Sequence, residues 1–114
     1  MTIPHGTKAM IFAAGLGTRL KPFTDKHPKA LAPVNGKPLL QRNIEYLRGF
    51  GIKDIIVNVH HFADQIINFI EQNNQFGISI SISHEVEEPL ETGGGLKKAG
   101  WFFEDSKHPF IVCN

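Results

Sequence analysis

The sequence has little cysteine, no long hydrophobic run and almost no net charge, and each of these features excludes a class of protein. The single cysteine, Cys113, cannot form an internal disulfide, so the chain is not a disulfide scaffold and suits a reducing compartment. No apolar run approaches the roughly 20 residues that span a bilayer, and the first residues lack the apolar core of a signal peptide. The net charge of +1 gives no reason to expect a nucleic acid or a membrane as partner. We therefore expect a cytoplasmic protein.

The composition and the apolar patterns indicate one α/β unit over residues 1–114. Apolar residues make up 41% and charged residues 20%, as in ordinary globular domains. The apolar run 8–13 predicts a strand that is buried on both faces, and residues 54–59, rich in β-branched side chains, predict a second buried strand. The run 78–83 alternates strictly, which predicts a strand near an edge of the sheet, and residues 110–114 predict a fourth strand.

Segments with helical spacing separate these predicted strands. The first helix lies within residues 36–51, with Pro38 in its first turn and with Gly49 and Gly51 at its end. The second runs from about Phe62 to Gln72, and the third begins near Thr92. Strands that alternate with helices favour right-handed crossovers, a mostly parallel sheet and helices on both faces. Ligands bind such sheets at the carboxyl ends of the strands, so we expect the chemistry in the loops there.

The loop after the first strand carries residues that a simple turn does not need. Gly15 and Gly17 let the backbone approach a ligand and point successive amides at one place. The Walker motif is absent from the sequence, and the dinucleotide fingerprint fails because Leu20 stands at its sixth position. A tight strand-to-helix turn would explain the glycines but not Arg19 and Lys29 nearby.

The same stretch matches a longer pattern. Residues 15–33 read GLGTRLKPFTDKHPKALAP, which fills the pattern G-x-G-T-R-L-x-P-x-T-x-x-x-P-K-x-L-x-P. This stretch resembles the signature loop of the sugar-1-phosphate nucleotidyltransferases, and the resemblance continues through NGKPLL, VNVHH and EEPLETGGGL. The later segments look most like the mannose-1-phosphate guanylyltransferase branch and the related muramate- and heptose-phosphate enzymes. The resemblance implies a Rossmann-like three-layer α/β/α fold; Ala14, where many members carry glycine, is a mild departure.

The resemblance implies roles for individual residues. In the family, the position of Arg19 holds the β- and γ-phosphates, and the position of Lys29 contacts the phosphates at the reacting centre. These two residues are therefore the predicted catalytic residues. The predicted nucleotide-binding residues are Ala13, Ala14, Gly15, Gly17, Thr18 and Arg19 in the first loop, with Glu88, Thr92 and Gly93 near the base.

Other charged residues are interpreted as ordinary surface. Lys21, Lys26 and Lys37 are expected to be solvated, and so are the acidic residues Glu85, Glu87 and Glu91. His60 and His61 are adjacent, so strand geometry would send them to opposite faces, and we interpret them as half-buried histidines rather than a metal pair.

The resemblance also implies a metal ion that residues of this chain do not bind. In the family, an aspartate at the end of the fourth strand binds the catalytic Mg²⁺, and that position would fall just past Asn114. A second aspartate and the sugar pocket would lie further on. We therefore interpret the chain as the nucleotide-binding half of a longer enzyme, truncated after its fourth strand. Such a half would expose apolar surface, so we expect it to self-associate into a homo-oligomer.

The function implied is transfer of a nucleoside monophosphate from a nucleoside triphosphate to a sugar-1-phosphate, with release of pyrophosphate. Within the family, GTP and mannose-1-phosphate are favoured, while uridylyl or cytidylyl transfer stays open, including transfer to phosphocholine. The alternative from another class is a non-catalytic nucleotide-binding or regulatory module with the same fold. Arg19 and Lys29 argue against it, because a sensor has little need for both cations.

Overall fold

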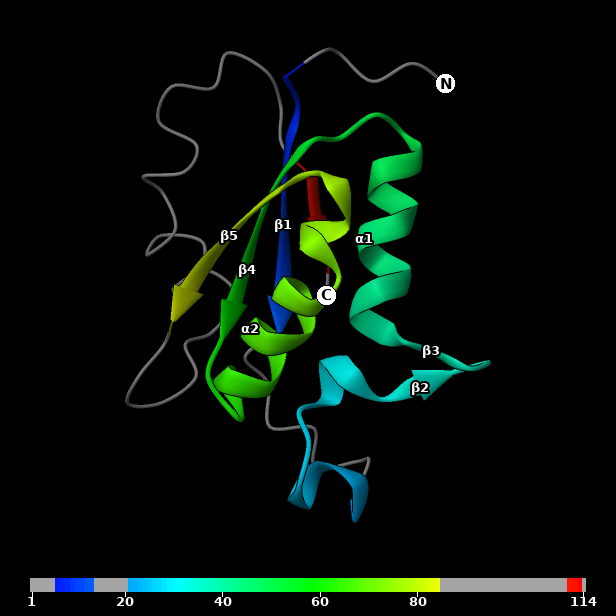
Figure 1. Ribbon diagram of the computed structural model, residues 1–114, viewed down its shortest axis with the longest axis vertical. Helices are drawn as coiled ribbons and strands as arrows, with labels where there is room; N and C mark the ends of the chain where they lie inside the picture. Colours follow the sequence, from blue (N-terminus) through cyan, green and yellow to red (C-terminus); the bar gives the residue numbers. More distant parts are fainter. Residues whose placement is uncertain (1–5, 14–20, 85–110, 114) are drawn as a thin grey trace.

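A four-stranded parallel sheet forms the centre of the protein. The computed structural model describes residues 6–13, 21–84 and 111–113 (Figure 1). The strands are β1 (Lys8–Ala13), β4 (Asp54–Val59), β5 (Ser79–His84) and β6 (Ile111–Cys113), and they lie in the order β5-β4-β1-β6. All three pairings are parallel, which confirms the predicted α/β class and sheet. β5 stands at an edge, as its alternating sequence predicts.

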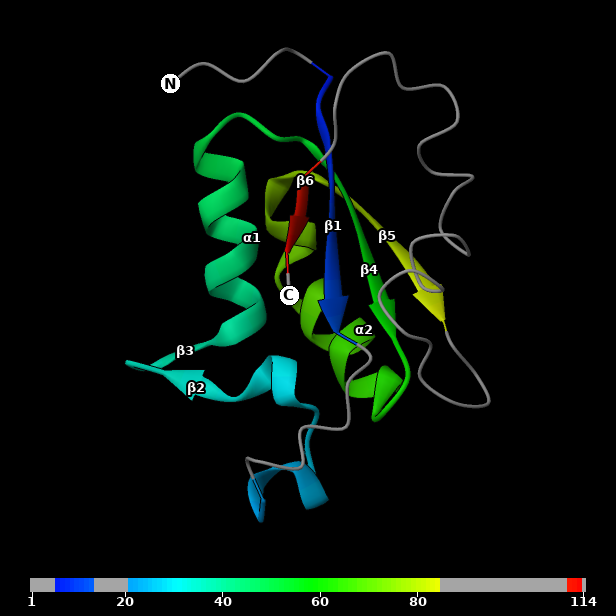
Figure 2. The same ribbon diagram turned by 180° about the vertical axis from the view of Figure 1, so that it is seen from behind.

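Two helices pack on one face of this sheet. They are α1 (Leu39–Gly49) and α2 (Ala63–Gln72), and Figures 1 and 2 show the sheet from its two sides. Alternate residues of the central strands share one buried cluster with these helices; the cluster includes Ala9, Ile11, Ile55, Val57, Leu40, Ile44, Leu47, Ile66 and Ile70. The intervening residues Met10 and Ile56 point to the opposite face and are also fully buried. The third helix, expected from Thr92, lies outside the described residues.

The end of α1 is set by a glycine. Gly51 has φ +91°, a conformation that costs little without a Cβ atom. Its amide donates to the carbonyl of Arg48, and the amide of Ile52 donates to that of Leu47, with N···O distances of 2.9 and 3.3 Å. These two bonds form a Schellman motif, which satisfies the last carbonyls of the helix. The predicted helix end is confirmed, with Gly51 as the residue that stops it.

Gly51→Ala should therefore destabilise the full-length protein by about 1 kcal/mol, because alanine is strained at positive φ. Gly49→Ala is the matched control: Gly49 lies in the last turn of the helix with open space around its Cβ position, and alanine favours helix there. Urea denaturation should show a lower midpoint for the first variant and an equal or higher one for the second. Equal losses in both variants would show that the helix end does not depend on the conformation of Gly51.

The start of α2 differs from the prediction by one residue. Phe62 is not in the helix but precedes it, with left-handed φ and ψ of 54° and 43°. The helical periodicity of Ile66, Phe69 and Ile70 could not show this, because an apolar residue just before a helix can occupy the same face. No helix among the described residues combines the length and the apolar character that crossing a membrane requires.

A short hairpin, which the sequence analysis did not predict, precedes α1. Its strands are β2 (Pro33–Val34) and β3 (Lys37–Pro38), joined by Asn35-Gly36, both at positive φ. An Asn-Gly pair is a strong hairpin signal, so the sequence contained the information. Pro38, placed in the first turn of the helix by the sequence analysis, instead ends β3 and caps α1.

Side chains of α1 bind this hairpin. The Arg42 guanidinium donates to the carbonyls of Val34 and Asn35 at 2.6 and 3.1 Å. The Lys37 ammonium lies 2.8 Å from the Glu45 carboxylate, and this hydrogen bond, with a second from Gln41, lowers the pKa of Glu45. The hairpin is thereby held against α1.

Candidate functional site

The carboxyl ends of three strands lie level with one another. Ala13, the last residue of β1, pairs with Val59, and Val59 pairs with His84, the last residue of β5. The loops that follow these strands therefore leave the sheet at the same edge. In Figure 1 the arrowheads point to the end of the molecule where residues 21–31 lie. The structure thus brings the end of β1 and the segment that contains Lys29 to one edge, as the sequence analysis predicted.

Ala13 is held at this edge by an asparagine side chain. Asn58, the penultimate residue of β4, is 1% exposed, and its Oδ1 atom accepts a hydrogen bond from the backbone amide of Ala13. A buried amide is therefore paired where the strand ladder ends. The bond fixes the point at which the chain enters residues 14–20, so Asn58 is a functional candidate that the sequence analysis missed.

Residues 22–32, which we call the lysine arm, lie beyond the carboxyl ends of the strands (Figure 1). The arm contains two short 3₁₀ turns, η2 (Phe23–Asp25) and η3 (Lys29–Leu31). Lys29 begins η3 and is exposed, while Pro28 and Ala30 on either side of it are buried. The described part of the chain contains no ion pair to its ammonium group. Lys29 is therefore a cation held on a packed backbone with its side chain accessible, as binding a phosphate requires.

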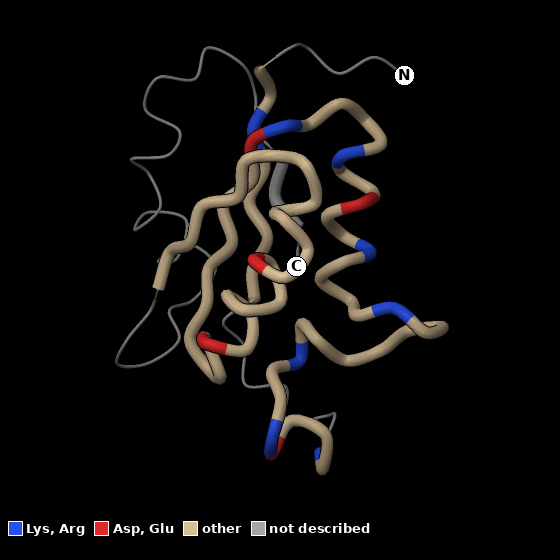
Figure 3. The backbone as a smooth tube through the Cα atoms, in the orientation of Figure 1, with Lys and Arg blue, Asp and Glu red and all other residues tan. Residues whose placement is uncertain are grey.

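The other lysines near the arm are surface residues, as predicted. Lys21, Lys26 and Lys37 are exposed, and Lys37 forms the ion pair with Glu45. Figure 3 shows that positively charged residues recur along the segment before α1. Their local field favours an anionic ligand at this end of the molecule.

The arm contacts the residues that follow β4 and the first turn of α2. The His61 imidazole lies 3.0 Å from the carbonyl oxygen of Thr24, so its Nε2 atom carries the proton and donates. Gln65 donates to the carbonyl of Lys26 at 2.7 Å and accepts from Nδ1 of His27 at 2.9 Å. His60 and His61 are both half-buried, as interpreted from the sequence, but these contacts of His61 and Gln65 were not predicted.

Most of the predicted nucleotide-binding residues lie outside the described residues. They are Ala14, Gly15, Gly17, Thr18, Arg19, Glu88, Thr92 and Gly93. Their roles stay predictions. Of the predicted site, the structure places Ala13 and Lys29.

No residues with the donors for a metal ion come together in residues 6–13, 21–84 and 111–113. No three His, Cys, Asp or Glu side chains form a group there that could hold one. Mg²⁺ prefers carboxylate and other oxygen ligands, and none of the four described strands of the sheet ends in a carboxylate. The described residues therefore do not by themselves fit the expected cofactor.

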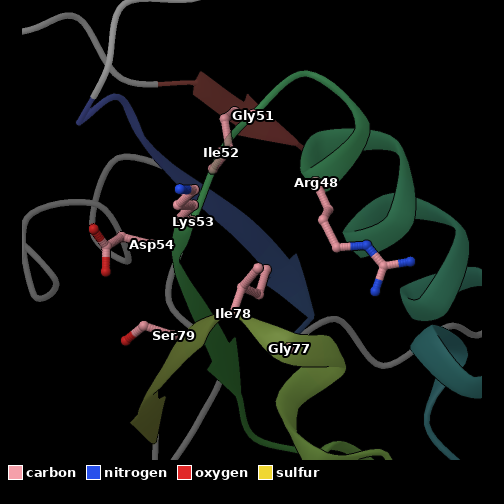
Figure 4. A pocket seen from close by; sticks show the side chains of 8 residues that line it. All are labelled: Arg48, Gly51, Ile52, Lys53, Asp54, Gly77, Ile78 and Ser79. Atoms are coloured by element: carbon pink, nitrogen blue, oxygen red, sulfur yellow. The ribbon is translucent and has the colours of Figure 1, made fainter.

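A surface depression of about 620 Å³ lies at the opposite edge of the sheet (Figure 4). Asp54 and Ser79, the first residues of β4 and β5, line it together with Arg48 and Lys53. The Arg48 guanidinium donates to the carbonyl of Phe76 at 2.7 Å, which joins α1 to the turn before β5. This depression is at the amino ends of the strands and is separate from the candidate site.

Known proteins resemble this chain over nearly all of its length. A family model described as nucleotidyl transferase matches residues 8–114. The chain is 43% identical over 93 residues to N-acetylmuramate alpha-1-phosphate uridylyltransferase of Caulobacter vibrioides, a match that covers 80% of this chain and 38% of that protein. It is 39% identical over 108 residues to mannose-1-phosphate guanyltransferase beta-B of Xenopus laevis, covering 94% of this chain and 30% of that protein.

A solved structure gives the same result for the fold. The crystal structure of HddC from Yersinia pseudotuberculosis, complexed with GMP-PN, matches with a TM-score of 0.77 and 38% sequence identity. The match covers 93% of this chain and 47% of HddC. The chain spans 38% of the length of the uridylyltransferase and 30% of the length of the guanyltransferase.

Proposed function

The chain belongs to the nucleotidyl transferase family, and on that premise we propose that the full-length protein transfers a nucleoside monophosphate from a nucleoside triphosphate to a sugar-1-phosphate, with release of pyrophosphate. The observation that carries the proposal is the family match over residues 8–114, within which the pattern at residues 15–33 is complete. The two curated relatives, by their names, are transferases that act on a sugar-1-phosphate or a muramate phosphate, which supports this class of acceptor.

The reaction needs cations at fixed positions. An oxygen of the acceptor phosphate attacks the α-phosphorus of the triphosphate, the bond to the β-phosphate oxygen breaks, and negative charge moves onto the leaving pyrophosphate. We assign Arg19 to the β- and γ-phosphates, because a guanidinium can bind two phosphate oxygens at once. We assign Lys29 to the phosphates at the reacting centre. Its exposed ammonium stands on a backbone that buried neighbours fix, so little ordering is needed when it engages.

We also propose that Mg²⁺ takes part and that residues beyond Asn114 bind it. The described residues contain no group of three His, Cys, Asp or Glu side chains that could hold it, so an aspartate that would follow β6 is the candidate ligand. β6 pairs with β1 in a register that sets Cys113 beside Ile11, so a ligand just past β6 would emerge at the edge where Ala13 lies. When bound, Mg²⁺ would neutralise part of the negative charge of the phosphates.

Within this class we propose a guanylyltransferase that acts on mannose-1-phosphate. The similarity to mannose-1-phosphate guanyltransferase beta-B supports this choice, and so does the similarity to HddC, whose structure was solved with GMP-PN. The identity to a uridylyltransferase, 43%, is higher than either of these, so sequence identity does not decide the base, and we expect the choice to depend on residues 85–95.

Pyrophosphate release from the full-length protein tests both levels of the proposal. The purified protein is incubated with Mg²⁺, each of the four ribonucleoside triphosphates, and a panel of sugar-1-phosphates together with phosphocholine. We expect turnover with a sugar-1-phosphate and the highest kcat/KM with GTP and mannose-1-phosphate. Preference for UTP or CTP would overturn the proposed choice of GTP but leave the proposed reaction class intact. Nucleotide binding without turnover on any acceptor would favour the non-catalytic module instead.

A further inference from the structure

The corner formed by residues 60–65, which follow β4 and include the first residues of α2, binds the lysine arm through three side-chain hydrogen bonds. His61 donates to Thr24, and Gln65 bonds both Lys26 and His27. These contacts join residues that are 37 to 39 positions apart, so they are tertiary contacts and not consequences of local chain geometry. Figures 1 and 2 both show the arm lying beyond the start of α2.

The corner itself is well packed, which makes it a suitable support. Ile66, in the first turn of α2, is fully buried, and Ala63 is 7% exposed. The amide of Gln65 donates to the carbonyl of Phe62 at 3.0 Å, which closes that turn. The His61 ring lies against the Phe62 ring with centroids 4.2 Å apart, so the imidazole that reaches Thr24 is itself packed.

One of the arm residues that Gln65 binds, His27, is only two positions from Lys29, so the corner fixes the backbone close to Lys29. Only Pro28 separates His27 from Lys29, and its φ is fixed by its ring and its side chain is buried. On the other side of Lys29, the carbonyl of Ala32 accepts a hydrogen bond of 2.9 Å from the amide of Leu39 at the start of α1. The backbone of Lys29 is thus held between two helices.

We propose that His61 and Gln65 are positioning residues, which hold the lysine arm so that the Lys29 ammonium meets the phosphates at the reacting centre. This inference rests on the proposed function, because it concerns the same site. Neither side chain needs to touch substrate. Misplacement of a catalytic group by about 1 Å can cost 10²-fold in rate. The loss of the two hydrogen bonds from Gln65 to the arm should move Lys29 less than that, so we expect a smaller but measurable loss of rate.

Gln65→Ala in the full-length protein is the main test, because Gln65 is partly exposed and its loss leaves no cavity. We expect kcat to fall by about tenfold while KM for the nucleoside triphosphate changes by less than about twofold. Asn68→Ala is the matched control, since it removes an exposed amide side chain from the same helix that does not contact the arm. A loss at Asn68 as large as that at Gln65 would overturn the proposal.

A double-mutant cycle separates positioning from general support of the structure. If Gln65 acts through Lys29, Gln65→Ala should have no further effect in a protein that already carries Lys29→Ala. If the costs of the two substitutions multiply, Gln65 does not act through Lys29 and the proposal is wrong. At His61, glutamine keeps a donor that can reach the Thr24 carbonyl, so His61→Gln should retain several times the activity of His61→Leu. Equal activity of these two variants would count against the proposal as well.

Hydrogen exchange tests the contacts without any catalytic assay. The amides of Asp25, Lys26 and His27 donate to backbone carbonyls within the arm. Gln65→Ala should speed their exchange at least severalfold while leaving the amides of β1 and β4 unchanged. Unchanged exchange in the arm would overturn the proposal. A wild-type protein that turns over no substrate would refute the proposed function, and the exchange experiment would still decide whether the corner holds the arm.

Discussion

Arg19→Ala in the full-length protein should lower kcat/KM by about 10²-fold or more, the usual result of removing a donor that stabilises developing charge. The guanidinium is assigned to the β- and γ-phosphates, where negative charge accumulates as pyrophosphate leaves. Lysine cannot replace it fully, because a single ammonium lacks the planar pair of donors that binds two oxygens. Pyrophosphate release under initial-rate conditions measures the effect.

Lys21→Ala is the control for Arg19→Ala. Lys21 lies two positions away, carries the same charge and is exposed, so its loss should change kcat/KM by less than about threefold. The comparison cancels any general effect of lowering the positive charge of the segment. Equal losses at both positions would mean that Arg19 has been wrongly assigned to the β- and γ-phosphates.

Asn58→Ala should destabilise the protein by about 2–4 kcal/mol. The substitution leaves the buried amide of Ala13 without its acceptor, which costs about 1–3 kcal/mol, and it adds a cavity beside the central strands. The urea midpoint of the full-length protein should fall accordingly. Asn68→Ala, an exposed asparagine, should alter stability by less than about 0.5 kcal/mol. A loss at Asn58 no greater than that at Asn68 would show that the amide of Ala13 finds another partner.

The elements that depend on local pattern were predictable from the sequence. The strands 8–13 and 54–59 have the predicted bounds, because short, mostly apolar runs of six residues are too short for a helix and fit a buried strand. The strand predicted at 78–83 begins one residue later, at Ser79, since strict alternation fixes the faces of a strand better than its ends. Of the strand predicted at 110–114, the structure describes Ile111–Cys113.

The contacts that build the site were not predictable in the same way. That Asn58 bonds Ala13, and that His61 reaches Thr24, depends on how strands and helices far apart in sequence come together. No periodicity in the sequence signals such pairs, and His61 alone looks like an ordinary half-buried histidine. The left-handed conformation of Phe62 escaped prediction for a similar reason, because the surrounding packing has to stabilise it.

The strand order also determines how this sheet can be made. β1 lies between β4 and β6, and its register joins Ala9 to Ile111, two residues far apart in sequence. During synthesis β1 can pair with β4 early, but its other side stays an open edge until β6 has left the ribosome. Pairings so distant in sequence slow folding, and an unpaired apolar strand edge invites pairing with another chain. The interval before β6 pairs with β1 is therefore a step at which nascent chains of this protein are exposed to misassociation.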